Sequence, residues 1–242
     1  MNFNVFPGCL FAFNMIYRFL PVCAAVCLFI TVTVLGEDQD DWEEVRNVEG
    51  IRIYTREIPE SPLIAVRGIS LLDAGLFKTG HIIRDISRYP EWVPQLQFAR
   101  IVEQEKKSEW LVYLLIELPW PVSDRDVLLS YRTEINETGD RITYHIHSVE
   151  HDSVPELPDV IRAEIPAAMI MLAGNGQEQT LLDANMQLDL KGFIPFFVNH
   201  FITRKLPVKL ISRLRRQSRK DDIVVDTIYW NDLVNQSSQS HR

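Results

Sequence analysis

Several polar side chains have types and spacings that could do chemistry. His145 and His147 lie two residues apart, so a strand would place both imidazoles on one face, and Glu150, His151 and Asp152 follow closely. Two imidazoles and a carboxylate are ligands that zinc accepts, but a zinc site needs a complete ligand set, and an H-x-H pair by itself occurs often by chance. We therefore expect no metal and no cofactor.

Glu117 and Arg132 form a second candidate, a carboxylate and a guanidinium on predicted strands. Glu117 shares its expected strand face with the apolar Leu111, Tyr113 and Leu115. A carboxylate in an apolar wall needs a partner, and Arg132 could supply it, so that the pair would orient the polar group of a ligand. The alternative is that both side chains are solvated on an outer face.

The motifs of the common catalytic classes are absent from the sequence. It contains no G-x-S-x-G elbow, no P-loop, no dinucleotide fingerprint and no HExxH motif. All three cysteines, Cys9, Cys23 and Cys27, lie in the first 36 residues, so the rest of the chain has neither a thiol nucleophile nor a disulfide. We expect a protein that is not an enzyme.

The first 36 residues differ from the rest of the chain. Their one charged residue is Arg18, residues 19–35 are an apolar run, and an acidic stretch follows Gly36. This layout is typical of a secretory signal, with Val34–Gly36 as the cleavage site and Met15 as an alternative start. The run is slightly short of the ~18 to 20 residues of a membrane anchor, which is the alternative. We expect a secreted or periplasmic protein.

The remaining 206 residues carry 24 basic and 33 acidic side chains, a formal net charge of −9. This acidity argues against nucleic acid as a partner. The length suits one domain that is large enough to bury a core, which we place at residues 37–222, before a C-terminal tail at 223–242. We expect this domain to be a monomer.

The elements that must position these residues follow from the hydrophobic periodicity. The pattern predicts helices at 38–49, 75–88 and 197–220, and strands at 51–58, 63–72, 98–105, 109–118, 126–135, 140–150, 161–173 and 179–190. Residues 136–139, Asn-Glu-Thr-Gly, are a hairpin turn. Such a run of strands needs a cover for its apolar face, and the last helix offers one at helical spacing. Its apolar positions are Phe197, Phe201, Leu206, Leu210 and Leu214.

A curved sheet that grips one long helix encloses space. Met169 and Met171 on one predicted strand and Met186 on the next would suit a wall that adapts to an apolar guest, because methionine is flexible and polarizable. The alternative is that these methionines are ordinary core residues.

One further set of residues is distinctive for its order and spacing: Trp92, Pro119-Trp120-Pro121, Ser123-Asp124-Arg125-Asp126, Gly192, Pro195 and Asn199. In these residues the chain from about 40 to 220 resembles the START domain family of lipid transfer proteins. The resemblance implies an α+β helix-grip fold, in which a curved antiparallel sheet wraps around a long C-terminal helix and an internal hydrophobic cavity. It also implies binding, and transfer, of a sterol, fatty acid or phospholipid. Two departures are Met169, where the family usually has tryptophan, and Asp189–Gly192 in place of a DPGG-like turn.

In the family the Ser-Asp-Arg-Asp element is mainly architectural. Strand alternation puts Asp124 and Asp126 on one face and Arg125 on the other. An unpaired arginine in an apolar layer would cost several kcal/mol, so we predict that Arg125 binds neighbouring backbone or an acid. The prolines end the preceding strand, and Trp120 is expected to seal the corner. The alternative is that the cluster binds a ligand headgroup.

Strand parity and the resemblance together give a set of candidate site residues. The cavity candidates are Tyr113, Glu117, Arg132, Met169, Met171, Leu182, Met186, Phe196, Phe197 and Phe201. Residues 203–220 contain no acid, which favours docking of the last helix on an anionic membrane, at ~1 kcal/mol for each cation. These cations are Arg204, Lys205, Lys209, Arg213, Arg215 and Arg216. Their alternative is a solvated outer face, and the rival function is a polyketide cyclase or aromatase on the same fold.

Overall fold

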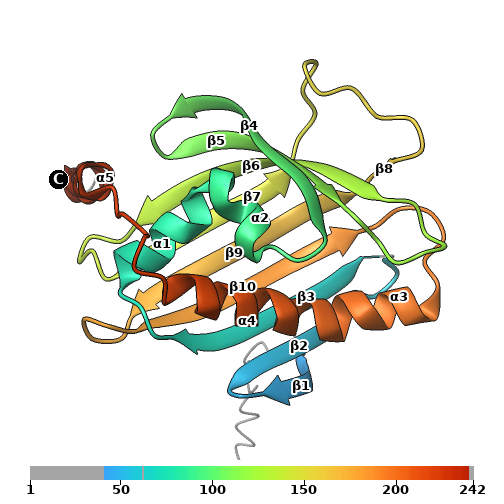
Figure 1. Cartoon of the computed structure of the whole chain (residues 1–242), viewed down its shortest axis with the longest axis horizontal. Helices are drawn as coiled ribbons and strands as arrows, with labels where there is room; N and C mark the ends of the chain where they lie inside the picture. Colours follow the sequence, from blue (N-terminus) through green and yellow to red (C-terminus); the bar gives the residue numbers. More distant parts are fainter. Residues whose placement is uncertain (1–40, 62, 240–242) are drawn as a thin grey trace, which may run out of the picture. The chain divides into compact units, whose positions relative to one another are not determined.

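The computed structural model describes residues 41–61 and 63–239, which belong to one compact unit (Figure 1). The predicted signal or anchor at residues 1–36 lies outside the described residues. Within the described part, every helix is too short or too polar to cross a membrane.

A curved antiparallel sheet forms the main layer. Its order is β1-β2-β3-β10-β9-β7-β6-β5-β4, and the short β8 (Ile161–Arg162) pairs in parallel with β6. The other strands are β1 (Glu43–Val48), β2 (Ile51–Glu57), β3 (Ile64–Leu72), β4 (Leu96–Lys106), β5 (Glu109–Ile116), β6 (Arg125–Ile135), β7 (Arg141–Ser148), β9 (Glu164–Gly174) and β10 (Thr180–Asp189). The predicted turn between β6 and β7 is present, with Gly139 at φ 71°.

The helices cover one face of this sheet (Figure 1). Helix α1 (Leu76–Arg84), the 3-10 turn η1 (Ile86–Arg88) and α2 (Tyr89–Trp92) lie across it first. The C-terminal rod follows, made of α3 (Phe196–His200), the π-helical turn η2 (Phe201–Lys205) and α4 (Leu206–Ser218). We call the covered face concave and the other face convex. The predicted fold class, a sheet gripping a long C-terminal helix, is confirmed.

The π turn interrupts the rod at a position that the periodicity did not show. The Leu206 N–H donates to the Phe201 carbonyl, five residues back, and Pro207 has no N–H to offer the Thr203 carbonyl. A proline and a π turn in succession are the usual causes of a bend or a weak point in a helix.

The helix predicted at 38–49 is wrong, because the structure forms strand β1 there. Glu49 and Gly50 both have positive φ values, 50° and 74°, which make a tight two-residue connection between β1 and β2. The stretch is too short to sustain an isolated helix, whereas pairing with β2 satisfies its backbone.

The tail predicted at 223–242 also needs correction, because helix α5 (Thr227–Gln239) forms within it. Tyr229, Trp230 and Leu233 are buried in the main core, and Trp230 is only 1% exposed. Trp230 packs so closely on α1 that a Cβ placed on Gly80 would lie 2.9 Å from its ring. This helix is part of the domain.

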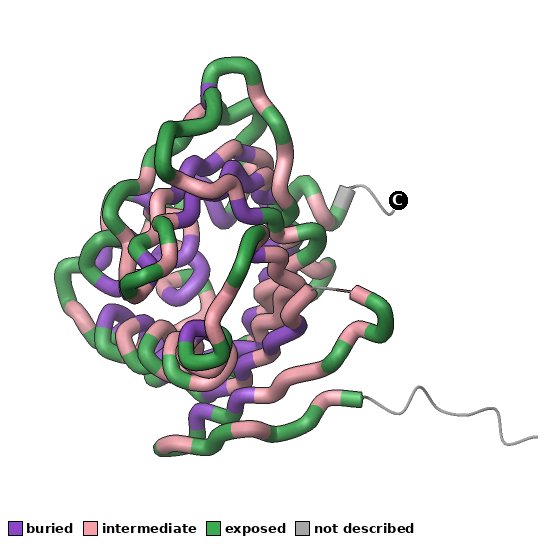
Figure 2. The backbone as a smooth tube through the Cα atoms, turned by 90° about the vertical axis from the view of Figure 1, so that its right-hand side faces the viewer, coloured by how far each residue is buried: buried purple, intermediate pink, exposed green. Residues whose placement is uncertain are grey.

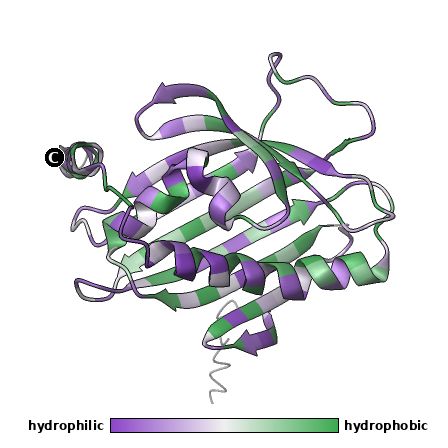
Figure 3. Cartoon of the chain, in the orientation of Figure 1, coloured by the Kyte–Doolittle hydropathy of each residue, from purple (hydrophilic) through white to green (hydrophobic). Residues whose placement is uncertain are grey.

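Buried residues gather between the sheet and the helices, and exposed ones follow the loops (Figure 2). The strands alternate between hydrophobic and hydrophilic residues along much of their length (Figure 3). A smaller cluster lies on the convex face, where Tyr113 and Leu128 pack with Val154 of the loop that follows β7. The sheet therefore separates two apolar layers, of which the concave one is the larger.

Candidate functional site

The concave layer is hollow. A chamber of about 240 Å³, here called the central chamber, lies between the sheet and helices α1, α2 and α4. Its lining is Val66, Gly68, Ile83, Tyr89, Trp92, Val93, Leu114, Leu129, Tyr131, Ile146, Ile165, Ala168, Ile170, Ala184, Asn185, Met186, Pro207, Leu210 and Ile211. Almost all of these side chains are apolar, which suits a hydrophobic guest.

A second chamber of about 170 Å³, here called the end chamber, continues the first towards the start of β6. Six side chains line both chambers, so the two are direct neighbours: Val93, Leu114, Leu129, Ile165, Met186 and Leu210. Leu118, Leu190 and Ile202 close its far side, together with the guanidinium-bearing Arg125. We call these two adjoining chambers under the C-terminal rod, both with mainly apolar linings, the cavity.

Arg125 is only 2% exposed, and each nitrogen of its guanidinium donates to a backbone carbonyl. Its Nε donates to the Leu190 carbonyl at 2.7 Å, its Nη2 to the Lys191 carbonyl at 3.0 Å, and its Nη1 to the Ser123 carbonyl. Burial lowers the pKa of Arg125. The prediction that Arg125 binds neighbouring backbone is confirmed. Its three bonds tie the loop before β6 to the loop after β10.

The aspartates on either side of Arg125 have different partners. Asp126 is fully buried and accepts Nε and Nη2 of Arg162 at 2.7 and 2.9 Å and the Tyr113 hydroxyl at 3.1 Å. Asp124 accepts the Leu118 amide at 3.2 Å. These contacts give the Ser-Asp-Arg-Asp element the architectural role that the resemblance implied.

The tyrosines of the central chamber are neutral donors. Burial raises the pKa of Tyr131 to about 12 and the pKa of Tyr89 well above its ordinary value. The Tyr89 hydroxyl donates to the Ile83 carbonyl at 2.7 Å. Trp92 also lines this chamber, and it is 6% exposed.

The methionine candidates divide between the two faces of the sheet. Met186 lines both chambers. It pairs directly with Ala168 of β9, and paired residues share a face, so Met169 and Met171 belong to the opposite face. The lining of β9 is instead Ile165, Ala168 and Ile170.

Four further cavity candidates do not line the cavity. Tyr113 packs in the convex cluster, and Glu117 is exposed beyond the end of β5. Arg132 is exposed and forms an ion pair with Glu134 at 2.8 Å rather than with Glu117. Leu182 is buried in the core but lines neither chamber.

The aromatic candidates of the C-terminal rod are mostly on the surface. Phe196 and Phe197 are 85% and 53% exposed, and Phe201 packs against the small cluster around Val198. Trp120 is 89% exposed, so it does not seal the corner as expected. Asn199 is exposed and its carbonyl accepts the Thr203 hydroxyl.

The basic residues of the rod are partly engaged in the fold. Arg215 donates to the Leu71 and Glu49 carbonyls at 3.1 and 2.8 Å, and Lys209 donates to Gln95 at 3.2 Å. Arg204 and Arg213 are half-buried, whereas Lys205 and Arg216 are exposed.

The histidine cluster stays on the surface of the sheet. His145 and His147 line a surface pocket of about 340 Å³ with Arg132 and two glutamates. His145 contacts Glu134 at 3.1 Å, and His151 contacts Glu103 at 3.1 Å. The described residues contain no group of three or more His, Cys, Asp or Glu side chains that could hold a metal ion.

Most of the residues that line the two chambers were not predicted from the sequence, although one feature of the sequence points to some of them. Arg125 was predicted to enter an apolar layer, and Val127, Leu129 and Tyr131 share its strand face. Val127 pairs with Leu114 of β5, so Leu114 also faces the cavity and Tyr113 does not. The register that makes this step possible is not visible in the sequence.

A curved antiparallel sheet that holds an apolar cavity beneath a long C-terminal helix defines the helix-grip class of ligand-binding domains. The START domain profile matches residues 28–220. The chain therefore belongs to the START (StAR-related lipid transfer) family, whose members usually bind lipids.

Three similar proteins illustrate the range of the family. An uncharacterized protein of Pseudomonas aeruginosa is 23% identical over 201 residues, which cover 83% of this chain and 96% of that protein. Mouse acetyl-coenzyme A thioesterase is 26% identical over 66% of this chain, which spans only 28% of the thioesterase. The solved structure of human StAR-related lipid transfer protein 5 has a TM-score of 0.69 at 18% identity, covers 75% of this chain and 88% of its own, and supports the fold.

Proposed function

We propose that this protein binds a hydrophobic lipid in the cavity under the C-terminal rod and carries it between membranes without covalent chemistry. The observation that carries the proposal is the apolar lining of the two adjoining chambers. Each buried methylene gains about 0.8 kcal/mol, so a lipid tail in this cavity can compete with a membrane before ordering costs are counted.

The chemistry of the cavity wall supports a carrier. Its titratable lining residues are Tyr89, Tyr131 and Arg125. Burial keeps both phenols protonated, and the guanidinium is bonded to carbonyls. General acid–base catalysis needs a group whose pKa lies near the working pH, and these three residues do not supply one.

Exposed aromatic side chains support membrane docking at the end chamber. Trp120 and Phe193 are 89% and 86% exposed, and Phe196 and Phe197 follow at the start of the rod. Figure 3 shows the α3 end of the rod as its more hydrophobic part. We call these four residues the docking face. Arg125 ties their two loops together, and aromatic rings favour the interface of a bilayer.

Opening of the cavity is proposed at the π turn. The far end of α4 is fixed by Arg219, which pairs with Asp73 at 2.7 Å, and by Gln217, which donates to Glu91 at 2.8 Å. The α3 end carries the exposed docking face instead. A movement of residues 196–205 about Pro207 would uncover the end chamber while the rest of α4 stays in place.

The compartment is part of the proposal. The apolar run at residues 19–35 supports export or membrane attachment, so we propose that transfer takes place outside the cytoplasm.

The test uses the full chain and a cavity-filling variant. Ala168 lines the central chamber, whereas its neighbour Ala167 is exposed on the opposite face. Lipid bound to purified protein is extracted and identified, and the intact complex is weighed by native mass spectrometry. We expect Ala168→Phe to lose at least about tenfold of the bound lipid and Ala167→Phe to keep it, since a phenyl ring occupies much of the chamber.

Two outcomes would count against the proposal. Equal lipid content in both variants would show that the lipid is bound elsewhere. Recovery of a cleaved or cyclised lipid, formed only in the presence of protein, would show an enzyme rather than a carrier.

A further inference from the structure

Two tripeptides of the same pattern have no role in the cavity: His145-Ile146-His147 on β7 and Met169-Ile170-Met171 on β9. The two strands are antiparallel neighbours in the sheet (Figure 1). The central isoleucine of each tripeptide lines the central chamber, so the residues on either side of it belong to the convex face. Two imidazoles and two thioethers therefore lie on one surface of the sheet.

The strand register decides which of these side chains meet. His145 pairs directly with Met169, and residues directly opposite each other have Cβ atoms about 5 Å apart. His147 lies two residues further along β7, at about 7 Å from His145, and both histidines border the same surface pocket. Met171 lies in the other direction, opposite Thr143, so it is remote from His147. The register thus brings together two imidazoles and the thioether of Met169.

Both imidazoles have a nitrogen that can bind a metal ion. Nε2 of His145 lies 3.1 Å from Oε2 of Glu134, whose Oε1 pairs with Nη2 of Arg132 at 2.8 Å. A metal-bound histidine commonly donates its second ring N–H to a carboxylate, which fixes the orientation of the ring. Nδ1 of His145 and both ring nitrogens of His147 have no hydrogen-bond partner in the described part of the chain. The side chain of His145 is 40% exposed, so an ion can reach it from solvent.

The thioether determines which metal fits. Zinc takes nitrogen, thiolate or carboxylate ligands, and the described residues hold no group of three or more His, Cys, Asp or Glu side chains that could bind it. A thioether is a soft ligand that selects Cu(I), and imidazole also suits copper. Among the described residues that line the surface pocket, the one arginine or lysine is Arg132, which is paired with Glu134, whereas Glu105 and Glu109 add negative charge. This surface therefore does not repel a monovalent metal cation.

We propose that His145, His147 and Met169 bind one Cu(I) ion on the convex face of the sheet. The ion is held by one nitrogen of each imidazole and by the sulfur of Met169, and Glu134 orients the ring of His145. The thickness of the sheet separates this site from the cavity, so copper binding does not depend on the proposed lipid. A copper ion and a lipid can be bound at the same time.

The test uses the full-length chain with Cys9, Cys23 and Cys27 replaced by serine, because thiolates would also bind Cu(I). This cysteine-free chain is titrated with Cu(I) at neutral pH without oxygen, in competition with the chromophoric chelator bicinchoninate. X-ray absorption at the copper edge then identifies the ligand atoms. We expect one Cu(I) ion per chain, with two nitrogen atoms and one sulfur atom as its nearest neighbours.

The variants, made in the cysteine-free chain, separate the ligands from their neighbours. Met169→Leu should weaken Cu(I) binding at least about tenfold and remove sulfur from the copper spectrum. Met171→Leu is the matched control, because Met171 lies on the same strand and the same face but remote from His147, and it should bind copper normally. His147→Gln should also weaken binding, whereas His151→Gln, at a histidine of the following loop that contacts Glu103, should not.

Three results would overturn the inference: no uptake of Cu(I) by the cysteine-free chain, a copper spectrum without sulfur, or equal copper affinities of Met169→Leu and Met171→Leu. The last two would reduce the site to a pair of histidines. None of these results bears on lipid carriage, which the extraction of bound lipid tests separately. The spectrum requires no substitution at the site itself, so it remains decisive even if one of the variants does not fold.

Discussion

Replacement of Arg125 by methionine tests whether this buried cation is a structural clamp. The side chain is 2% exposed and holds the carbonyls of Leu190, Lys191 and Ser123. Methionine replaces the aliphatic part of the arginine side chain in the wall of the end chamber, but it has no hydrogen-bond donor. Three carbonyl oxygens then lose their donor at the end of the cavity where the docking face lies.

The magnitude follows from these three bonds. At about 1 kcal/mol for each acceptor left unpaired, the lower end of the usual range, the loss is about 3 kcal/mol. The substitution also removes the free-energy cost of burying a charged guanidinium, which offsets part of this loss. We therefore expect a net decrease in the free energy of unfolding of about 2 to 3 kcal/mol.

The assay is urea unfolding, together with hydrogen exchange of the two loops that Arg125 joins. Exchange should rise at residues 119–124 and 190–195. The control is Arg132→Met on the same strand, where the arginine is exposed and pairs with Glu134, and its loss should stay below about 0.5 kcal/mol. If Arg125→Met unfolds like the control and its loops exchange no faster, the clamp reasoning is wrong.

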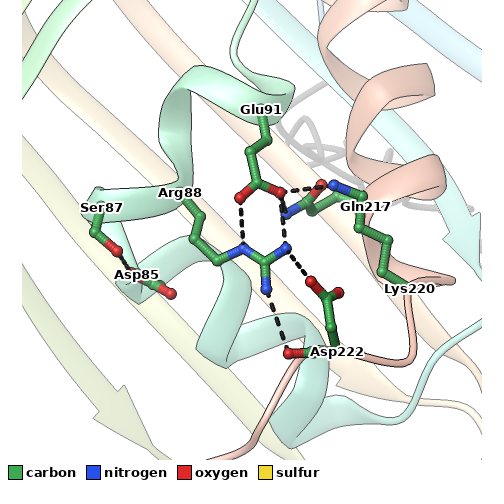
Figure 4. A network of polar contacts seen from close by, with 7 residues as sticks. All are labelled: Asp85, Ser87, Arg88, Glu91, Gln217, Lys220 and Asp222. Atoms are coloured by element: carbon green, nitrogen blue, oxygen red, sulfur yellow. Dashed lines mark hydrogen bonds and ion pairs between the residues drawn. The ribbon is translucent and has the colours of Figure 1, made fainter.

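Three further predictions concern other parts of the domain. Trp230→Ala should lower the free energy of unfolding, measured with urea, by about 3 to 5 kcal/mol, because it leaves a cavity at a fully buried site. Ile228→Ala in the same helix, at a position that is 72% exposed, should change it little. The double variant Trp120→Ser, Phe196→Ser should bind anionic vesicles at least about tenfold more weakly in a co-sedimentation assay, with an unchanged melting temperature. The control is Val224→Ser, at another exposed apolar position, which should bind vesicles like the wild type. Glu91→Gln should reduce thermal stability more at pH 7 than at pH 3. Arg88, Lys220 and Gln217 (Figure 4) hold the pKa of Glu91 well below its ordinary value, so the stabilisation is complete above about pH 4.3 and shrinks progressively as the pH falls towards the lowered pKa. An equal loss of melting temperature at pH 7 and pH 3 would contradict this account.

The sequence predicts the architecture of this domain because its signals are local. The long strands alternate, Asn136–Gly139 forms the expected turn, and the last helix keeps its apolar spacing across the π turn. Where the local signal is short it fails. The acidic stretch before Gly50 is so short that its pattern fits a helix as well as strand β1. The C-terminal segment is mostly polar, so its composition does not indicate that Trp230 is buried.

The cavity lining was harder to predict, because it depends on which face of each strand turns inward. An error of one residue in the alternation along a strand exchanges its two faces. The predicted lining residues Tyr113 and Met169 therefore lie on the opposite face, and their neighbours Leu114 and Ala168 line the chambers. Arg125 was the one residue whose partners could be predicted from physics alone. A charge in an apolar layer must be paired, whatever the register.

That same residue connects the stability of the domain with its proposed function. Arg125 forms part of the end chamber wall, and its bonds hold the loops that carry Trp120 and Phe193. A membrane that draws these aromatic side chains into its interface would pull on the two loops that Arg125 joins, next to the rod's π turn. If the protein docks and opens as proposed, the three bonds of Arg125 oppose separation of the two loops. A variant with fewer of these bonds should then exchange its lipid faster and retain it less well.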